Sequence, residues 1–288
     1  MQQKSIQILK FFFFLLLAFM LLTGCSQKTE EELLAEKIEE EIEFLDSYLI
    51  SSLNQMNHIS LQNYQIKSQE ITDSAKQKKT SSESSGGGEG QSSENETNKN
   101  NTTIHYSAQP GDVLVNDQNT NWESTKIEIE RLYSSWSSIM MDLYQTNIDK
   151  NEISNFNQDL DQLIAYAKSE DKNNTLTYLA KLYQYLPKYV EGTIQNTIKT
   201  DLLKTKAEVM NAYAKIEQDN WDGIKNDLTK AEEKFMPIVN NITNENHYNV
   251  NKAYVLLKEF QSSVSKMDKD LLYIKYKNLI QELNLIEA

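Results

Sequence analysis

Helical periodicity is the feature of this sequence that most limits its fold. Beyond residue 120, apolar side chains recur every three or four residues in successive segments, which is the spacing of one face of an α-helix. Strand and turn signals are scarce, because the 288 residues include only three prolines and eight glycines. This pattern predicts an all-α domain over residues 104–288, with about seven helices arranged as a helical bundle or a short α-solenoid.

The expected helices follow from the positions of these apolar faces. Pro187 is expected to kink or end the third helix, and Pro237 to follow the end of the fifth. Before the first helix, Val113-Leu114-Val115 predicts a short extended piece, and Thr120 with Glu123 has the form of a capping box. The seven apolar faces span residues 129–143, 153–167, 176–190, 194–216, 221–235, 250–264 and 272–286.

An internal echo suggests a duplicated three-helix unit. Residues 121–126 and 220–225 share the pattern Asn-Trp-acid-x-x-Lys, and each segment opens a set of three expected helices. The alternative is local, because a tryptophan at the start of a helix often anchors only its first turn in a core.

A separate amphipathic helix is expected within residues 25–71. Thr29 and Glu32 have capping-box spacing, and an apolar stripe follows in steps of three and four residues. Packing on the downstream domain is favoured over a self-associating coiled coil, because about three heptads is the lower limit for the latter. The stripe consists of Ile38, Ile42, Leu45, Leu49, Met56 and Ile59, with Ser52 in its one gap.

The composition changes sharply over residues 72–103. Ala75 is the one apolar residue among Ser, Gly, Glu, Lys and Asn, so this segment has too little apolar surface to fold and is predicted to be a disordered linker. It could separate two modules or form a long loop inside one.

The first 25 residues have the form of a secretion signal. Lys4 and Lys10 precede the uncharged run 11–22. As a helix this run would rise roughly 18 Å, which is short of the roughly 30 Å hydrocarbon core of a bilayer. It ends in Leu22-Thr23-Gly24-Cys25, which resembles the lipobox of bacterial lipoproteins: a branched apolar residue, a small residue, glycine and an obligatory cysteine.

The resemblance implies that residues 1–24 are a leader removed by a lipoprotein signal peptidase, which recognises Leu22, Thr23 and Gly24. Cys25 would then carry a diacylglyceryl thioether with fatty acids such as palmitate. The mature protein would be held on the extracytoplasmic face of the cell membrane, in a bacterium of the Gram-positive type. Because Cys25 is the sole cysteine, disulfides and cysteine-based metal sites are excluded.

Charge narrows the choice of partner. Without residues 1–24, which contain two lysines and no acid, the chain has 27 basic and 42 acidic side chains, a formal charge of −15. Nucleic acid is therefore not an expected partner, since a general nucleic-acid binder needs a basic surface. The same charge argues against adhesion to anionic lipids, so the membrane contact would depend on the lipid of Cys25.

No catalytic or cofactor motif stands out, and we expect neither enzymatic activity nor a cofactor. The three histidines, His58, His105 and His247, lack the spacing of a helix-borne metal site. Residues 86–90 are glycine-rich but lack the Gly-Lys-Ser/Thr ending of a phosphate loop.

A weak calcium candidate lies before the first helix of the domain. Asp117, Asn119, Asn121 and Glu128 fall at positions 1, 3, 5 and 12 of a calcium-loop template. However, Trp122 occupies the position at which that loop needs glycine for its sharp turn, so a helix cap with polar turn residues is the favoured interpretation.

Tyrosines suggest a weak candidate for a ligand site. Tyr178, Tyr185 and Tyr189 lie at helical spacing on the third expected helix, and such rings can line a groove for peptides or glycans. The simpler interpretation is that tyrosine replaces phenylalanine on half-buried helix surfaces.

Three functions remain open at this point. The first is a non-catalytic binding or scaffolding lipoprotein that engages another envelope protein or a small ligand. The second is a ligand- or metal-capturing helical lipoprotein of an envelope transport system. The third and least favoured is an envelope hydrolase, for which no nucleophile or base can be named.

Overall fold

The computed structural model describes residues 28–59, 113–115, 119–194, 196–241 and 247–286. The regular structure of these residues is helical throughout, as the periodicity predicts, and includes eight α-helices after residue 104 together with 3₁₀ turns. The α-helices are α2 (Glu30–Gln55), α4 (Trp122–Leu143), α5 (Lys150–Lys168), α6 (Lys172–Tyr183), α7 (Leu186–Thr193), α8 (Thr197–Ala214), α9 (Trp221–Asn240), α10 (His247–Ser263) and α11 (Lys269–Leu283).

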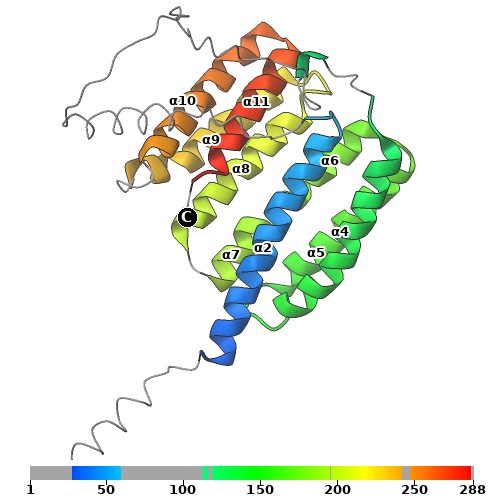
Figure 1. Ribbon diagram of the computed structural model, residues 1–288, viewed down its shortest axis with the longest axis vertical. Helices are drawn as coiled ribbons and strands as arrows, with labels where there is room; N and C mark the ends of the chain where they lie inside the picture. Colours follow the sequence, from blue (N-terminus) through cyan, green and yellow to red (C-terminus); the bar gives the residue numbers. More distant parts are fainter. Residues whose placement is uncertain (1–27, 60–112, 116–118, 195, 242–246, 287–288) are drawn as a thin grey trace, which may run out of the picture.

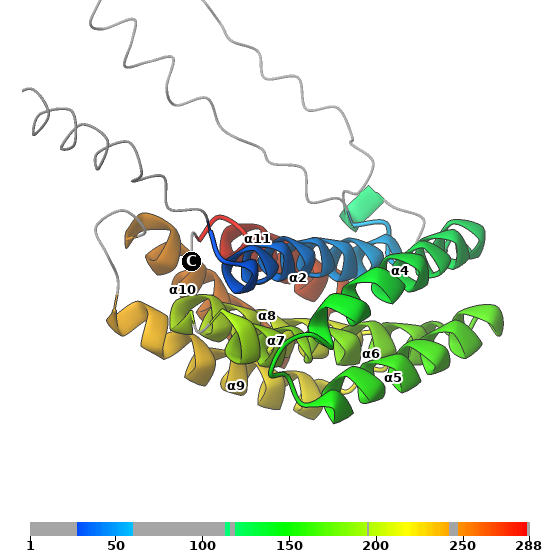
Figure 2. The same ribbon diagram turned by 90° about the horizontal axis from the view of Figure 1, so that it is seen from below.

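The helices form two layers (Figure 1, Figure 2). One layer contains α11, α2 and α4, and the other contains α9, α8, α6 with α7, and α5. Helix α10 packs on α11 of the first layer and on α9 of the second. Successive helices run in opposite directions, except that α7 continues in the direction of α6. One end of the bundle therefore holds the start of α2, and we call it the anchor end. The opposite end, where α2 finishes, is called the distal end.

Helix α2 is part of the same core as the downstream helices, in agreement with the favoured interpretation of its apolar stripe. Every residue of that stripe is buried, and so is Ser52 in its gap. The helix packs on α4, α6 and α7. Residues 60–112 thus connect two helices that contact each other, which makes this stretch an insertion within one packed body. The predicted linker, residues 72–103, lies outside the described residues.

Ion pairs join α2 to α8 across the layers. Lys206 of α8 is buried and its Nζ lies 2.9 Å from Oδ2 of Asp46, whose other oxygen accepts a hydrogen bond from the Tyr183 hydroxyl. About two turns of α8 toward the anchor end, Lys199 Nζ lies 2.7 Å from carboxylate oxygens of both Glu39 and Glu43. The acidic residues of α2 are therefore partly used in packing, because a buried lysine needs a carboxylate partner.

Helix capping follows the sequence closely at α2 and differs at α4. Thr29 and Glu32 form both hydrogen bonds of a capping box. The capping box predicted at Thr120 is wrong, because the side chain of Asn121 caps α4 while the Thr120 hydroxyl donates to the carbonyl of Met56. The extended piece predicted at Val113–Val115 is also wrong, since these residues form a 3₁₀ turn.

The prolines act differently from the simplest expectation. Pro187 stands at the start of α7, where its fixed φ suits the first helical turn, so the third expected helix is two helices. Pro237 lies inside α9, which continues to Asn240 because a proline in the last turn removes only one hydrogen bond and the turn still buries Ile238.

The Asn-Trp echo has a local explanation in the structure. Asn121 and Asn220 cap α4 and α9 with their side chains, and the tryptophans that follow, Trp122 and Trp221, are partly buried against the core. Shared capping chemistry accounts for the repeated residues without a duplication.

Candidate functional site

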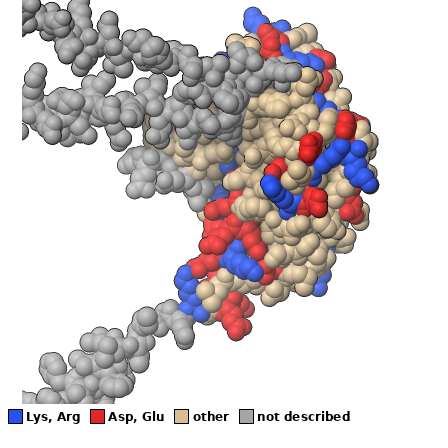
Figure 3. Space-filling view, turned by 45° about the vertical axis from the view of Figure 1, so that its right-hand side comes forward, with Lys and Arg blue, Asp and Glu red and all other residues tan. Residues whose placement is uncertain are grey.

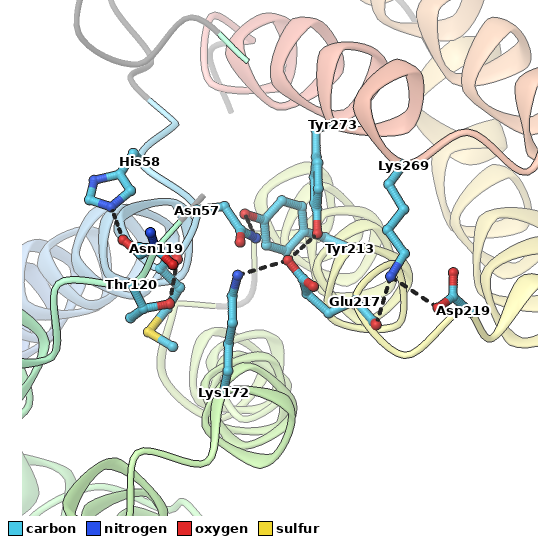
Figure 4. Close-up of polar contacts among 11 residues, drawn as sticks. Asn57, His58, Asn119, Thr120, Lys172, Tyr213, Glu217, Asp219, Lys269 and Tyr273 are labelled. Carbon is cyan, nitrogen blue, oxygen red and sulfur yellow. Dashed lines mark hydrogen bonds and ion pairs between the residues drawn. The ribbon is translucent and has the colours of Figure 1, made fainter. Parts of the chain in front are cut away.

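Polar side chains gather inside the protein where α2 ends. Asn54 and Asn57 belong to the last turn of α2 and the turn after it, and both are buried. They face three tyrosines, Tyr213 of α8 with Tyr273 and Tyr276 of α11, and the ring of Tyr213 contacts the other two. Figure 4 shows Asn57, Tyr213 and Tyr273 of this group. We call these five residues the tyrosine cluster. The ring centroid of Tyr213 lies 4.2 Å from that of Tyr276 and 5.3 Å from that of Tyr273.

The cluster is tied to charged groups at the distal end. Asn57 donates a hydrogen bond of 2.7 Å to the Tyr213 hydroxyl. The Tyr273 hydroxyl donates to Oε1 of Glu217 at 2.8 Å, and Lys172 Nζ donates to the same oxygen at 2.8 Å. Figure 4 shows these groups converging from the turn after α2, from α6, from α8 and the turn after it, and from α11. The carboxylate of Glu217 therefore connects α6 with α11.

Several polar atoms of the cluster have no hydrogen-bond partner among the described residues. They are Nδ2 and Oδ1 of Asn54, Oδ1 of Asn57 and the hydroxyl of Tyr276. Asn54 faces the Tyr276 hydroxyl without reaching hydrogen-bond geometry. An unsatisfied buried polar group costs roughly 1–3 kcal/mol, so these atoms lower the stability of the fold.

The protonation states of the cluster favour structural hydrogen bonding over catalysis. Burial raises the pKa of the tyrosines Tyr213, Tyr273 and Tyr276, so they are neutral phenols at physiological pH. Burial also opposes ionisation of Glu217, but hydrogen bonds from Lys172 and Tyr273 outweigh it and lower the pKa of that carboxyl. Neither a phenolate nor a carboxylate base with a pKa near neutrality arises in this arrangement.

A second titratable group lies nearer the anchor end, between α2 and α4. The side chains of Glu41 and Asp142 are 15% and 12% exposed and face each other. Burial raises the pKa of Glu41 to about 7, and the neighbouring carboxylate of Asp142 adds to the rise. Lys37 Nζ, 2.7 Å from Oδ2 of Asp142, lowers the pKa of the latter. Glu41 therefore stays protonated at pH values at which a glutamate is ordinarily ionised.

The calcium candidates have other roles where the structure describes them. Asn121 caps α4, and Glu128 accepts a hydrogen bond of 2.6 Å from the Tyr48 hydroxyl of α2. The carbonyl of Asn119 contacts a histidine ring, while Asp117 lies outside the described residues. Within the described part of the chain, no three His, Cys, Asp or Glu side chains are grouped as a metal site would require.

The tyrosine candidates do not share one exposed face. Tyr185 and Tyr189 are buried in the core, where their rings pack near Phe156 and, for Tyr189, Trp136. Tyr178 lies apart on α6 and is partly buried. The break between α6 and α7 separates these residues, since Tyr185 precedes the first residue of the second helix.

The tyrosine cluster itself was not predicted from the sequence. Tyr213 is part of an apolar face, but Asn54, Asn57 and Tyr276 lie in helical segments where buried and exposed polar residues look alike. The available signal is weak: two asparagines near the end of an otherwise apolar stripe.

Leu22, Thr23, Gly24 and Cys25 lie outside the described residues. Among the helices that the structure describes, none combines the length and apolar character needed to cross a bilayer. Comparisons of the chain with protein-family models, curated proteins and solved structures found no match.

Two tyrosine substitutions should separate paired from unpaired hydroxyls. Tyr273→Phe removes the donor to ionised Glu217 and should lower the free energy of unfolding by about 1–2 kcal/mol. Tyr276→Phe removes a hydroxyl without a described partner. It should lower the free energy of unfolding by less than about 0.5 kcal/mol, or raise that free energy. Urea unfolding followed by circular dichroism measures both, and the reverse order would contradict the hydrogen bonding described.

The Glu41 carboxyl should make stability depend on pH. Its pKa in the folded protein is above the ordinary value of 4.5, so the folded state keeps a proton that the unfolded state releases. The free energy of unfolding should therefore fall as pH rises from about 4.5 to about 7. Glu41→Gln mimics the protonated form and should be more stable than the wild type at pH 8, by about 1–3 kcal/mol, with little difference at pH 4.5.

Glu40→Gln, on the exposed side of α2, is the matched control and should leave the slope of stability against pH unchanged. A Glu41→Gln variant with the wild-type slope between pH 5 and 7 would show that Glu41 titrates normally.

Proposed function

We propose that this protein is a lipid-anchored, extracytoplasmic binding or scaffolding protein without catalytic activity. The observation that carries the proposal is the sequence Leu22-Thr23-Gly24-Cys25. It follows the uncharged apolar run 11–22, whose length is typical of a secretion signal. With Cys25 lipidated, the cell membrane is the first partner. An envelope protein or a small ligand would be the second, and the acidic charge argues against nucleic acid as a partner.

The position of α2 supports a scaffolding role. The helix begins at Glu30, five residues after Cys25, and such a segment spans at most about 17 Å when fully extended. Because α2 then continues through the core, an anchor at Cys25 would be joined directly to the packed body. The insertion 60–112 comes after α2, so it does not lie between the lipid and the bundle.

The chemistry of the described ionisable groups supports a role in binding. Glu217 is held by a lysine and a phenol, and Asp46 by a lysine and a phenol, so both serve packing contacts between helices. The ion pair between Lys37 and Asp142 joins α2 to α4. Groups committed to holding helices together are poorly placed to transfer protons to a substrate.

Replacement of Cys25 tests the anchor. The wild-type chain, expressed in a bacterium that processes lipoproteins, should fractionate with membranes and give an amino-terminal peptide that begins at a diacylated Cys25. Cys25→Ser should lose the lipid mass and leave the membrane fraction by this route, whereas Ser26→Ala, one position later, should behave as the wild type. An unmodified Cys25 with an intact leader in the wild-type protein would overturn the proposal.

A further inference from the structure

Charged residues lie at the distal end and at one side of the anchor end, where α2 begins with Glu30–Glu32 and α5 begins after Asp149. The other side of the anchor end is different. At the distal end, the turns 169–172, 215–222 and 264–270 are rich in Asp, Glu and Lys. At the anchor end, the described residues 192–194, 196–198, 235–241, 247–251 and 283–286 contain no Asp, Glu, Lys or Arg. In a chain with 25% charged residues, such a concentration of uncharged helix ends is informative. We call these residues the uncharged end.

The uncharged end is one surface formed by several helices. It combines the connection from α7 to α8, the last turn of α9, the start of α10 and the finish of α11. These segments lie near one another in both views (Figure 1, Figure 2). The side chain of Asn249 donates a hydrogen bond of 3.1 Å to the carbonyl of Leu285, which joins the start of α10 to the finish of α11. In the sequence, Glu245 and Glu287 fall in stretches that the structure does not describe.

Large apolar and aromatic side chains project from this end. Tyr248 is 72% exposed, Leu285 44% and Ile198 37%. Two of the charges at its margin are used in ion pairs: Lys252 Nζ lies 2.6 Å from Oε2 of Glu282, and Lys199 pairs with α2. Lys234, directly before residue 235, is exposed. Exposed apolar residues without competing charge are characteristic of surfaces that contact a partner or a membrane.

We propose that the uncharged end is the face that the protein lays against the lipid bilayer, with Tyr248, Leu285 and Ile198 in the interfacial region. This inference rests on the proposed lipid anchor at Cys25. The anchor decides between a bilayer and a protein as the occupant, because the five residues from Cys25 to α2 hold the anchor end within about 17 Å of the membrane surface. Tyrosine suits that location, since its ring is apolar and its hydroxyl remains hydrated.

The contact is weak without the tether. Only a few side chains enter the interface, and the first turn of α2, Glu30 to Glu32, places negative charge beside them. Figure 3 shows acidic side chains gathered around the start of this helix. Anionic lipids therefore oppose the contact and neutral lipids permit it. A short tether raises the effective concentration of the surface near the lipid to the millimolar range, which is enough to occupy a weak contact.

The experiment supplies the tether chemically. Mature protein, residues 25–288, is coupled through its only cysteine to a maleimide lipid in neutral phosphatidylcholine vesicles with brominated acyl chains, which quench nearby tryptophan. Native Trp122 and Trp221 begin α4 and α9 at the distal end, and Trp136 is buried, so they give a low background. Tyr248→Trp should add emission that the brominated lipid quenches. Ile127→Trp, exposed on α4 near the distal end, should add emission that is not quenched.

A charge placed in the surface gives a second readout. Leu285→Asp should reduce the quenching of the Tyr248→Trp reporter, and so should replacement of part of the neutral lipid by phosphatidylglycerol. Circular dichroism checks folding, and Leu285→Trp replaces the reporter if Tyr248→Trp does not fold. Equal quenching of the Tyr248→Trp and Ile127→Trp reporters, or no quenching of either, would overturn the proposal. Self-association of uncoupled protein that Leu285→Asp abolishes would instead assign the surface to a second copy, and would also overturn it.

Failure here is separable from failure of the proposed function. The maleimide lipid provides an anchor whether or not cells lipidate Cys25, whereas the mass of the native amino-terminal peptide reports lipidation alone.

Discussion

The burial of one face of α2 among the other helices is the constraint on which the rest of the structure depends. Its apolar stripe supplies core residues that contact both layers, and its acidic residues partner lysines of α8. Lys206 is the most demanding of these, because it is buried and its charge is balanced by Asp46. Removal of one partner from such a buried pair typically costs about 3–5 kcal/mol, so detachment of α2 would be expensive.

Because α2 begins five residues after Cys25 in the sequence, its packing in the core would fix how the body is oriented relative to the lipid. A lipid at Cys25 would pull on a helix that is locked into the core, and the orientation of the body would follow from the orientation of α2. Both ends of the bundle then face different surroundings. The uncharged end would stand near the bilayer, and the charged distal end, with the tyrosine cluster beneath it, would face the aqueous phase and any envelope partner.

The sequence was informative wherever one local rule decided the outcome. The stripe of α2 and the Thr29 capping box could be predicted, because period and cap chemistry act within a few residues. Predictions were wrong where two local rules competed: Thr120 was assigned a cap that Asn121 provides, since the contact of Thr120 with Met56 comes from a segment far away in the sequence. The split at Pro187 was half predicted, as a kink or an end but not as the start of a further helix.

The tyrosine cluster could not be predicted for a related reason. Asn57 and Tyr213 are 156 residues apart, and their hydrogen bond depends on the placement of the turn after α2 beside α8. Tyr185 and Tyr189 illustrate the converse, because a helical spacing that could present rings on a surface instead places them in the core beside Phe156. Side-chain spacing alone does not say which face of a helix its neighbours will cover.

Hydrogen exchange of the backbone amides in α2 tests the central claim most directly. If α2 is integral to the core, amides between Ile38 and Leu53 should exchange only through global unfolding, with the same free energy of opening as the central amides of α8. Exchange of α2 through a separate opening of much lower free energy, while α8 stays protected, would show that the helix is a detachable segment and would contradict the account.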